Sequence, residues 1–289
     1  MRDIFIEELI LATKKNNNII LLVNDLGFGV IEEFKKKFPN NLINAGISEQ
    51  SMMGYAAGLA AAGKHVFVYS IANFPTFRCA EQIRNDIDYH NLPVTIVSVG
   101  SGVGYGHLGY SHHGLQDYAL MRSFPNMLIA SPGDIMECRA CIKYLIKNPQ
   151  PSYLRLDKSS TYSIHNKIPE IYPGKWIEVL KKNNNRDSLY LTTGAIIKYC
   201  LDNFYKKKKY SLYSLPLWGM KHKKNQFNYV KKYKKIIVIE DHFQDGGFQS
   251  WLLESLNKKF LKTNIISKSI NSKIVGKVGS QEFLMKFLF

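Results

Sequence analysis

The sequence predicts an α/β protein with two domains, each a mostly parallel sheet flanked by helices. Two observations lead to this class. Apolar, strand-like runs alternate with helical patterns from the start of the chain, and the alternation restarts after a polar stretch rich in Lys and Asn. Strands separated by helices pair in parallel, because each crossover lays a helix against the sheet. We therefore expect a larger first domain over residues 1–165, a linker over 166–185 and a smaller domain over 186–289.

The first domain is expected to begin with an amphipathic helix at Met1–Lys15, where apolar residues mix with acidic and basic ones. Short apolar runs that end at turn residues predict strands, and longer periodic runs predict helices. We expect strands at 19–23, 65–69, 92–99 and 127–130, and helices at 48–62, 78–88 and 134–145. The helix at 48–62 is rich in Ala, Gly and Met, so other backbones can approach it closely.

The second domain repeats the alternation. Its expected strands lie at 188–192, 210–215, 235–240 and 264–270, and its expected helices at 195–203 and 246–256. In open α/β sheets, ligands bind beyond the carboxyl ends of the strands. In the first domain, four places follow expected strands and should meet at one edge: Asp25, the residues after Asn44, the residues after Tyr69 and the glycine-rich loop 100–114.

The composition is that of an ordinary globular protein, with 289 residues of which 45% are hydrophobic and 21% charged. The sequence has no apolar run of the ~18 residues that indicate a membrane span. Acidic residues interrupt the first helix, unlike a secretory signal. Cys138 and Cys141 form a lone C-x-x-C without a second pair, so we expect reduced thiols rather than zinc or redox chemistry. We expect a cytoplasmic protein that does not contact a membrane.

The net charge of +16 raises the question of nucleic-acid binding. The lysines lie in scattered clusters with Asn beside them, so solvated lysine faces are favoured and no nucleic-acid partner is expected. An acidic protein partner or a phosphorylated substrate is a further option.

Glu49 is the first candidate for chemistry. It opens the small-residue helix in apolar company, where a desolvated carboxylate is suited to share a proton with a weakly basic ring nitrogen. The alternative is a first-turn Glu that satisfies the helix dipole. Phe74 and Phe77, three residues apart after a strand, can wall a flat heteroaromatic ring or can belong to the core.

Three histidines lie between glycines in the loop 102–114: His107, His112 and His113. Their spacing matches no standard zinc pattern, and no cysteine lies near. Imidazoles that bind substrate oxygens and transfer protons fit better. Plain surface histidines are the alternative.

Seven segments, taken in order, resemble those of transketolases and deoxyxylulose-phosphate synthases. They are Gly-Ile-Ser-Glu-Gln at 46–50, Gly-Val-Gly at 102–104 with Ser-His-His-Gly at 111–114, 122–126, 131–134, 193–194, 239–242 with 246–247, and 276–284. Single motifs are weak, but seven in order cover nearly the whole chain. The resemblance implies the pyrimidine-binding and C-terminal domains of a thiamine-diphosphate enzyme.

The resemblance assigns roles to individual residues. Glu49 matches the glutamate that hydrogen-bonds the aminopyrimidine ring of thiamine diphosphate, and Asp25 matches an aspartate near the thiazolium. Phe74 and Phe77 match the aromatic wall around the pyrimidine, although Ala80 stands where the family has a third aromatic residue.

The substrate pocket departs from the family. His112 matches the histidine that meets substrate hydroxyls, but Leu108 stands where an aspartate recognises a substrate hydroxyl, and Ser98 replaces a histidine before the glycine loop. We therefore expect a substrate other than the usual pentose phosphates. The residues expected to bind it, from the resemblance, are His107, His112, His113, Arg2 and Lys158.

Full-length members of the family begin with a domain whose Gly-Asp-Gly and later Asn bind Mg²⁺ and the diphosphate. This chain has no such pair, so no metal ligands are expected in it. The resemblance implies a β-type subunit of a split enzyme, whose partner carries the N-terminal section in an α2β2 assembly. Such an enzyme would move a two-carbon ketol or acyl unit between sugar-like or 2-oxo-acid substrates.

Two alternatives remain at this point. A 2-oxo-acid dehydrogenase β subunit has the same two-domain architecture and would pass acyl groups to lipoamide. A non-catalytic regulatory subunit or a basic nucleic-acid-binding protein belongs to another class. Retention of Glu49 together with the histidine loop argues against the second alternative.

Overall fold

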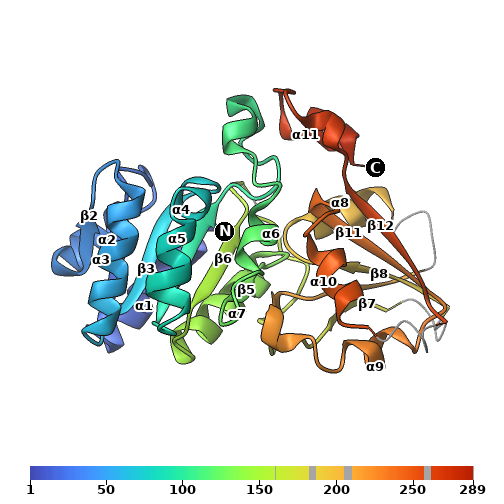
Figure 1. Ribbon diagram of the computed structural model, residues 1–289, viewed down its shortest axis with the longest axis horizontal. Coiled ribbons are helices and arrows are strands. Elements are labelled where there is room, and N and C mark those ends of the chain that lie inside the picture. The colour runs from blue at the N-terminus through green and yellow to red at the C-terminus, as the bar shows by residue number, and fades with distance from the viewer. Residues whose placement is uncertain (160, 182–186, 205–209, 257–261, 289) are drawn as a thin grey trace.

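Two sheets lie side by side, each flanked by helices (Figure 1), in the computed structural model, which describes residues 1–159, 161–181, 187–204, 210–256 and 262–288. Within these residues, the first sheet has the strand order β10-β5-β6-β4-β3-β1-β2 and the second has the order β12-β11-β8-β9-β7. Pairing is parallel except for β10 on β5 and β7 on β9. The predicted fold class is confirmed.

The strands of the first sheet are short and apolar. Most are buried along their whole length, as parallel strands covered on both faces must be. Their bounds are β1 (Ile19–Val23), β2 (Leu42–Asn44), β3 (His65–Ile71), β4 (Val94–Val99), β5 (Leu128–Ala130), β6 (Ser152–Leu156) and β10 (Leu217–Trp218).

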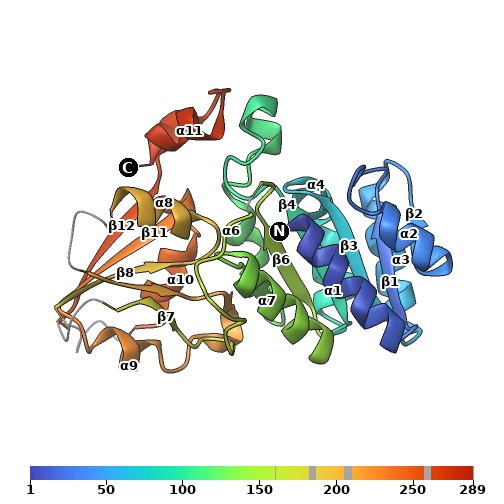
Figure 2. The same cartoon turned by 180° about the vertical axis from the view of Figure 1, so that it is seen from behind.

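Helices cover both faces of this sheet. On one face lie α3 (Glu49–Ala61), α4 (Phe74–Phe77), α5 (Ala80–Gln82) and the π-helix η2 (Ile83–Asp88), as Figure 1 shows. On the other face α1 (Arg2–Lys15) and α7 (Ile135–Lys147) pack against each other (Figure 2). The shorter elements are α2 (Glu32–Lys37), η1 (Pro39–Asn41), η3 (Gly106–Leu108), η4 (Tyr110–His112) and α6 (Asp117–Met121).

The second sheet contains β7 (Ile177–Leu180), β8 (Ser188–Thr192), β9 (Ser211–Ser214), β11 (Lys235–Phe243) and β12 (Asn264–Ile270). Its helices are α8 (Ile196–Asn203), η6 (Met220–His222), α9 (Gln226–Val230), α10 (Phe248–Glu254), η8 (Ser272–Ile274), α11 (Gln281–Leu284) and η9 (Met285–Phe287). In Figure 1, α11 stands beside the loop that carries η3 and η4, because the backbone N–H of Gly279 donates to Gly106.

Most expected elements are present within a few residues, and four differences stand out. The expected helix at 78–88 begins at Ala80 and turns into a π-helix. Three strands were not expected: β6, β10 and β7. Strand β7 lies inside the range expected as a linker, and β10 adds a strand from beyond that range to the first sheet. Residues 182–186 lie outside the described residues, and the proposed domain limits stay a prediction.

A buried ionic network joins the two sheets. Arg155, on β6, donates through Nε to Asp117 at 2.7 Å and through Nη1 to Asp241 on β11 at 2.6 Å. Its Nη2 donates to the carbonyl of Gly114 at 2.7 Å, and its guanidinium lies 4.2 Å from the centre of the Tyr118 ring. The side chains of Arg155 and Asp117 are each 1% exposed. A buried carboxylate needs such a partner, since desolvation of an unpaired charge is costly.

We expect Arg155→Met to lower the free energy of unfolding by about 3–5 kcal/mol, because Asp117 and Asp241 then lose their buried cation. Urea unfolding of the two proteins measures the difference. The control is Lys37→Met, which removes an exposed pair with Glu33 and should change the value by about 1 kcal/mol or less. Equal, small effects of the two substitutions would show that the network does not hold the sheets together.

His65 gives the fold a pH dependence of known sign. It is 6% exposed, it packs 4.7 Å from the ring of Phe67, and its Nε2 has no hydrogen-bond partner among the described residues. Burial lowers the pKa of His65 to about 4. Because the folded pKa lies below the unfolded one, protonation favours the unfolded chain as the pH falls below 6.5.

At pH 5 this linkage costs about 2 kcal/mol, from the two pKa values. His65→Phe should remove the cost, so the stability lost between pH 7 and pH 5 should be about 2 kcal/mol smaller in the variant. Other titrating groups are common to both proteins and cancel in the comparison. Urea unfolding at both pH values measures it, and an identical pH dependence would contradict the assignment.

Candidate functional site

Glu49 lies at the first residue of α3, where the chain leaves the carboxyl edge of β2. Its side chain is 7% exposed, and Oε1 accepts a hydrogen bond from Nη1 of Arg78 at 2.7 Å. The Arg78 side chain is 48% exposed, so the pair is open to water on one side. Glu49 and Arg78 border an open hollow of about 470 Å³, which residues 47–51 also line.

A short chain of side chains connects Glu49 to the histidine loop. The guanidinium of Arg78 lies 4.0 Å above the ring of Phe74, and the Phe74 ring meets the ring of His112 edge to face at 5.0 Å. Phe77 lies one turn along in α4 and is 46% exposed. The structure therefore brings Glu49, Phe74 and His112 to one edge of the first sheet.

The backbone of the histidine loop is tied to α4. Nδ2 of Asn73 donates to the carbonyls of Ser111, at 3.2 Å, and His113, at 2.8 Å. Oγ of Ser111 lies 3.0 Å from Nδ1 of His112. Burial lowers the pKa of His112, and the neighbouring His113 and Arg78 lower it further. His112 is therefore neutral near pH 7 and can both accept and donate a proton.

His107 and His113 have different surroundings. His113 is buried at 1% exposure, with Nε2 at 3.4 Å from the carbonyl of Gly106, so its ring braces the loop from inside. His107 is exposed on η3. Neither contacts the Glu49–His112 group through a described interaction, and their roles in substrate binding stay a prediction.

The two predicted phosphate-binding residues, Arg2 and Lys158, both lie near Tyr105. Nζ of Lys158 is 4.6 Å from the centre of the Tyr105 ring. Burial raises the pKa values of the Tyr69 and Tyr105 hydroxyls, and the positive charge of Arg2 acts against this in both. The ring of Tyr105 packs on Gly100, which has φ +95°, and a Cβ there would lie 2.1 Å from the ring. Only glycine permits this packing.

Asp25 follows β1 and is exposed, with φ +52°. Its N–H donates to Oδ1 of Asn44 at 2.9 Å, and its Oδ1 accepts from Nδ2 of Asn44 at 3.2 Å. The ends of β1 and β2 are thus fixed side by side, as expected of parallel neighbours. A role for Asp25 beside a thiazolium stays a prediction.

Two residues of this region carried no role in the sequence analysis. Arg78 is adjacent to Phe77 in the sequence, but only the fold shows that it reaches across to Glu49. Tyr105 lies in the glycine loop, and only its packing on Gly100 reveals its position between basic residues. A basic residue next to the aromatic pair was the one available signal.

Two further findings concern the part of the chain that the structure describes. No group of three or more His, Cys, Asp or Glu side chains there is arranged to hold a metal ion. None of its helices combines the length and the apolar character that crossing a membrane requires.

The fold and this edge of the first sheet define a pyrimidine-binding domain with a second α/β domain. The family model described as "Transketolase, pyrimidine binding domain" matches residues 1–163. One of the two subunits of apulose-4-phosphate transketolase from Actinobacillus succinogenes is 34% identical over 257 residues, which cover 88% of this chain and 82% of that one. The chain therefore belongs to the transketolase family.

Two other relatives place it within that family. The 1-deoxy-D-xylulose-5-phosphate synthase of Fusobacterium nucleatum is 27% identical over 98% of this chain but only 47% of its own length. A solved structure, "Split gene transketolase, inactive beta4 tetramer", superimposes with a TM-score of 0.82 at 25% identity, covering 99% of this chain and 92% of that chain. These matches confirm the resemblance to the C-terminal section of a split transketolase.

Proposed function

We propose that this chain is the β-type subunit of a split thiamine-diphosphate-dependent transferase that moves a two-carbon ketol or acyl unit. The observation that carries the proposal is the buried Glu49 carboxylate at the border of an open hollow, connected through Arg78 and Phe74 to His112. A structural first-turn Glu has no need of a ring-lined edge that ends in a neutral histidine.

The residues present fit the pyrimidine half of the cofactor. A buried carboxylate, two partly exposed phenylalanine rings and a hollow beside them suit a flat, weakly basic heteroaromatic ring. When bound, thiamine diphosphate supplies a nucleophilic carbon that takes up and releases the transferred unit. Glu49 would hold a proton at the ring nitrogen, and Phe74 and Phe77 would flank the ring.

Arg78 has a part in this proposal. In the isolated chain it holds Glu49 in place and neutralises it. A ring nitrogen that shares a proton with Glu49 competes for the same oxygen, so Arg78 must turn outward, which its 48% exposure permits. His112, neutral at pH 7, would meet the substrate hydroxyl.

The diphosphate and Mg²⁺ would be held mainly by the partner protein. Among the described residues of this chain no group could hold a metal ion. The related split-gene protein is described as inactive when it is a tetramer of β chains. We infer an α2β2 assembly in which the partner completes the site beside Glu49.

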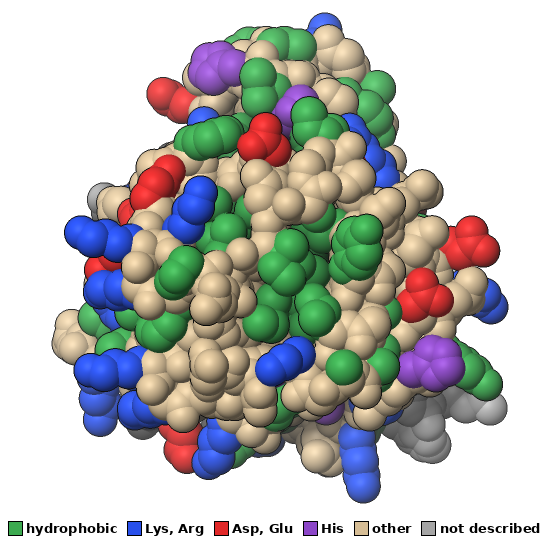
Figure 3. Space-filling view, turned by 90° about the vertical axis from the view of Figure 1, so that its left-hand side faces the viewer, with side chains coloured by type: hydrophobic (Ala, Val, Ile, Leu, Met, Phe, Trp, Pro, Cys, Tyr) green, Lys and Arg blue, Asp and Glu red, His purple; other side chains and the backbone are tan. Residues whose placement is uncertain are grey.

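The outer face of α3 is suited to receive that partner. Ile47 is 82% exposed and Tyr55 62% exposed, and an added Cβ at Gly54 or Gly58 would meet nothing within 4 Å. Figure 3 looks onto this side of the molecule, where hydrophobic side chains gather in the middle and charged ones lie toward the edges. Exposed apolar groups gathered in this way indicate a protein interface.

For the substrate, we infer a phosphorylated sugar. Arg2 and Lys158 place two cations near Tyr105, at the same sheet edge as His112. The relatives from Actinobacillus and Phocaeicola are named for a phosphorylated sugar, apulose 4-phosphate. Leu108 is 54% exposed and cannot accept a hydrogen bond from a substrate hydroxyl.

Glu49→Gln tests the proposed chemistry in the reconstituted complex with the partner. Glutamine keeps the shape but cannot exchange the ring proton, so turnover should fall by about 10²–10⁴. Hydrogen–deuterium exchange at the thiazolium carbon of bound cofactor should be lost as well. The matched variant His112→Ala should keep this exchange and lose substrate turnover. Exchange at the wild-type rate in Glu49→Gln would make Glu49 a structural residue only.

Gly54→Arg tests the partner surface. The position is helical and open, so the isolated chain should fold and gain up to about 1 kcal/mol of stability. The arginine then stands where the partner must approach, and co-purification with it should fail. Leu11→Arg, at an exposed position of α1 on the other side of the sheet, should leave assembly intact. Unchanged assembly of Gly54→Arg would place the partner elsewhere.

A further inference from the structure

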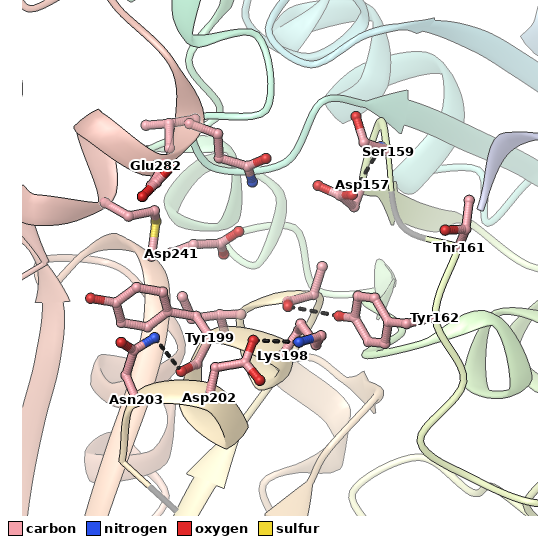
Figure 4. Close-up of a pocket in the computed structure, with 15 residues that line it drawn as sticks. Asp157, Ser159, Thr161, Tyr162, Lys198, Tyr199, Asp202, Asn203, Asp241 and Glu282 are labelled. Atoms are coloured by element: carbon pink, nitrogen blue, oxygen red, sulfur yellow. Dashed lines mark hydrogen bonds and ion pairs between the residues drawn. The ribbon is translucent and has the colours of Figure 1, made fainter.

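A second cavity lies between the two sheets, away from Glu49. Its volume of about 490 Å³ falls in the range of about 300–1,000 Å³ that small-molecule sites have. The walls come from α8, from α11 and η9, from the end of β11 and from residues 157–162, which follow β6 (Figure 4). It shares no lining residue with the hollow beside Glu49.

The cavity lies at the topological switch point of the second sheet. The chain crosses from β8 to β9 on one side, and from β11 to β12 on the other, while β8 and β11 are neighbours. Connections that diverge in this way leave a crevice beyond the carboxyl ends of the two strands, where open α/β sheets bind ligands. Ala195, just before α8, and Asp241, near the end of β11, line this crevice.

The lining is acidic although the chain is basic. Among the described residues that line the cavity, four carboxylates stand against a single ammonium group, that of Lys198, while the whole chain carries a net charge of +16. Lys198 pairs with Asp202 one turn later in α8. The carboxylates that line the cavity are Asp157, Asp202, Asp241 and Glu282.

These carboxylates are spread around the cavity. Figure 4 shows Asp157 and Asp241 on different walls, with Glu282 and Asp202 at further points of the lining. Among the described residues no three acidic groups approach closely enough to hold one metal ion. The charge is therefore matched by a cation whose positive groups are also spread out, rather than by a compact ion.

Apolar surface lies between the charges. The hydroxyl of Tyr162 donates to the carbonyls of Gly133, at 2.7 Å, and Ala195, at 2.9 Å, which fixes its ring as part of the wall. Nζ of Lys198 lies 6.0 Å from the centre of that ring, so an ammonium group already occupies its face. The side chain of Met285 also lines the cavity. Such walls suit methylene groups between two ammonium ends.

We propose that this cavity binds a linear organic polyamine, with ammonium groups on the dispersed carboxylates and methylene groups along Tyr162 and Met285. The site is independent of the function proposed above, because it needs neither Glu49 nor the partner protein.

Calorimetric titration of the full chain with spermidine tests the proposal, and saturable binding at one site per chain is expected. Putrescine should bind more weakly, and butane-1,4-diol, which has the same length without charge, should not bind. Glu282→Gln should weaken spermidine binding, and Lys198→Met should tighten it, each by about two- to fivefold for a partly exposed charge. The matched control Glu33→Gln removes an exposed carboxylate on α2, outside the cavity, and should change nothing.

A filling variant makes the test independent of charge. Ala195 has an ordinary helical backbone, so Ala195→Phe can place a ring in the cavity, and it should abolish binding. Equal loss of affinity in Glu282→Gln and Glu33→Gln would mean diffuse attraction to the surface and would overturn the proposal. Full competition by an equal concentration of Mg²⁺ would also overturn it, since a compact ion would then be the ligand.

Discussion

The guanidinium of Arg155 fixes how the two sheets meet, and both sites depend on that arrangement. It joins Asp117 of the first sheet's layer to Asp241 of the second sheet, and it holds the carbonyl of Gly114 at the end of the histidine loop. Because the donors of a guanidinium are rigid and planar, the three acceptors are held at set positions. The loop with His112 and the acidic wall of the interdomain cavity are therefore placed by one side chain.

The edge of the first sheet has the properties of half a site. Glu49 is buried on a rigid helix, yet the hollow beside it is open and the helix face around it is exposed. Arg78 holds the carboxylate in the free chain, at a cost in desolvation that its own exposure keeps small. A ring that enters between Glu49 and Phe74 replaces one partner of the carboxylate with another. Completion by a second chain accounts for both the open hollow and the apolar face.

Much of the fold could be predicted from local patterns. Strands such as Ile19–Val23 and Asn264–Ile270 are short apolar or alternating runs, and the structure has them at those limits. Strand β6 was missed because Arg155 interrupts its apolar pattern, and that charge is tolerated only through partners from distant segments. Strand β10 has two residues and depends on pairing with β5. The site follows the same division: Glu49 and His112 came from motifs, while Arg78 and Tyr105 depend on contacts across the sheet edge.

The most direct test of the central claim is a structure of the complex with the partner protein and thiamine diphosphate. The account predicts the Glu49 carboxylate within hydrogen-bond distance of the aminopyrimidine ring, the ring beside Phe74, and Arg78 turned away. It also predicts that the partner covers the α3 face at Gly54. Glu49 still paired with Arg78, and the pyrimidine bound elsewhere, would contradict the account.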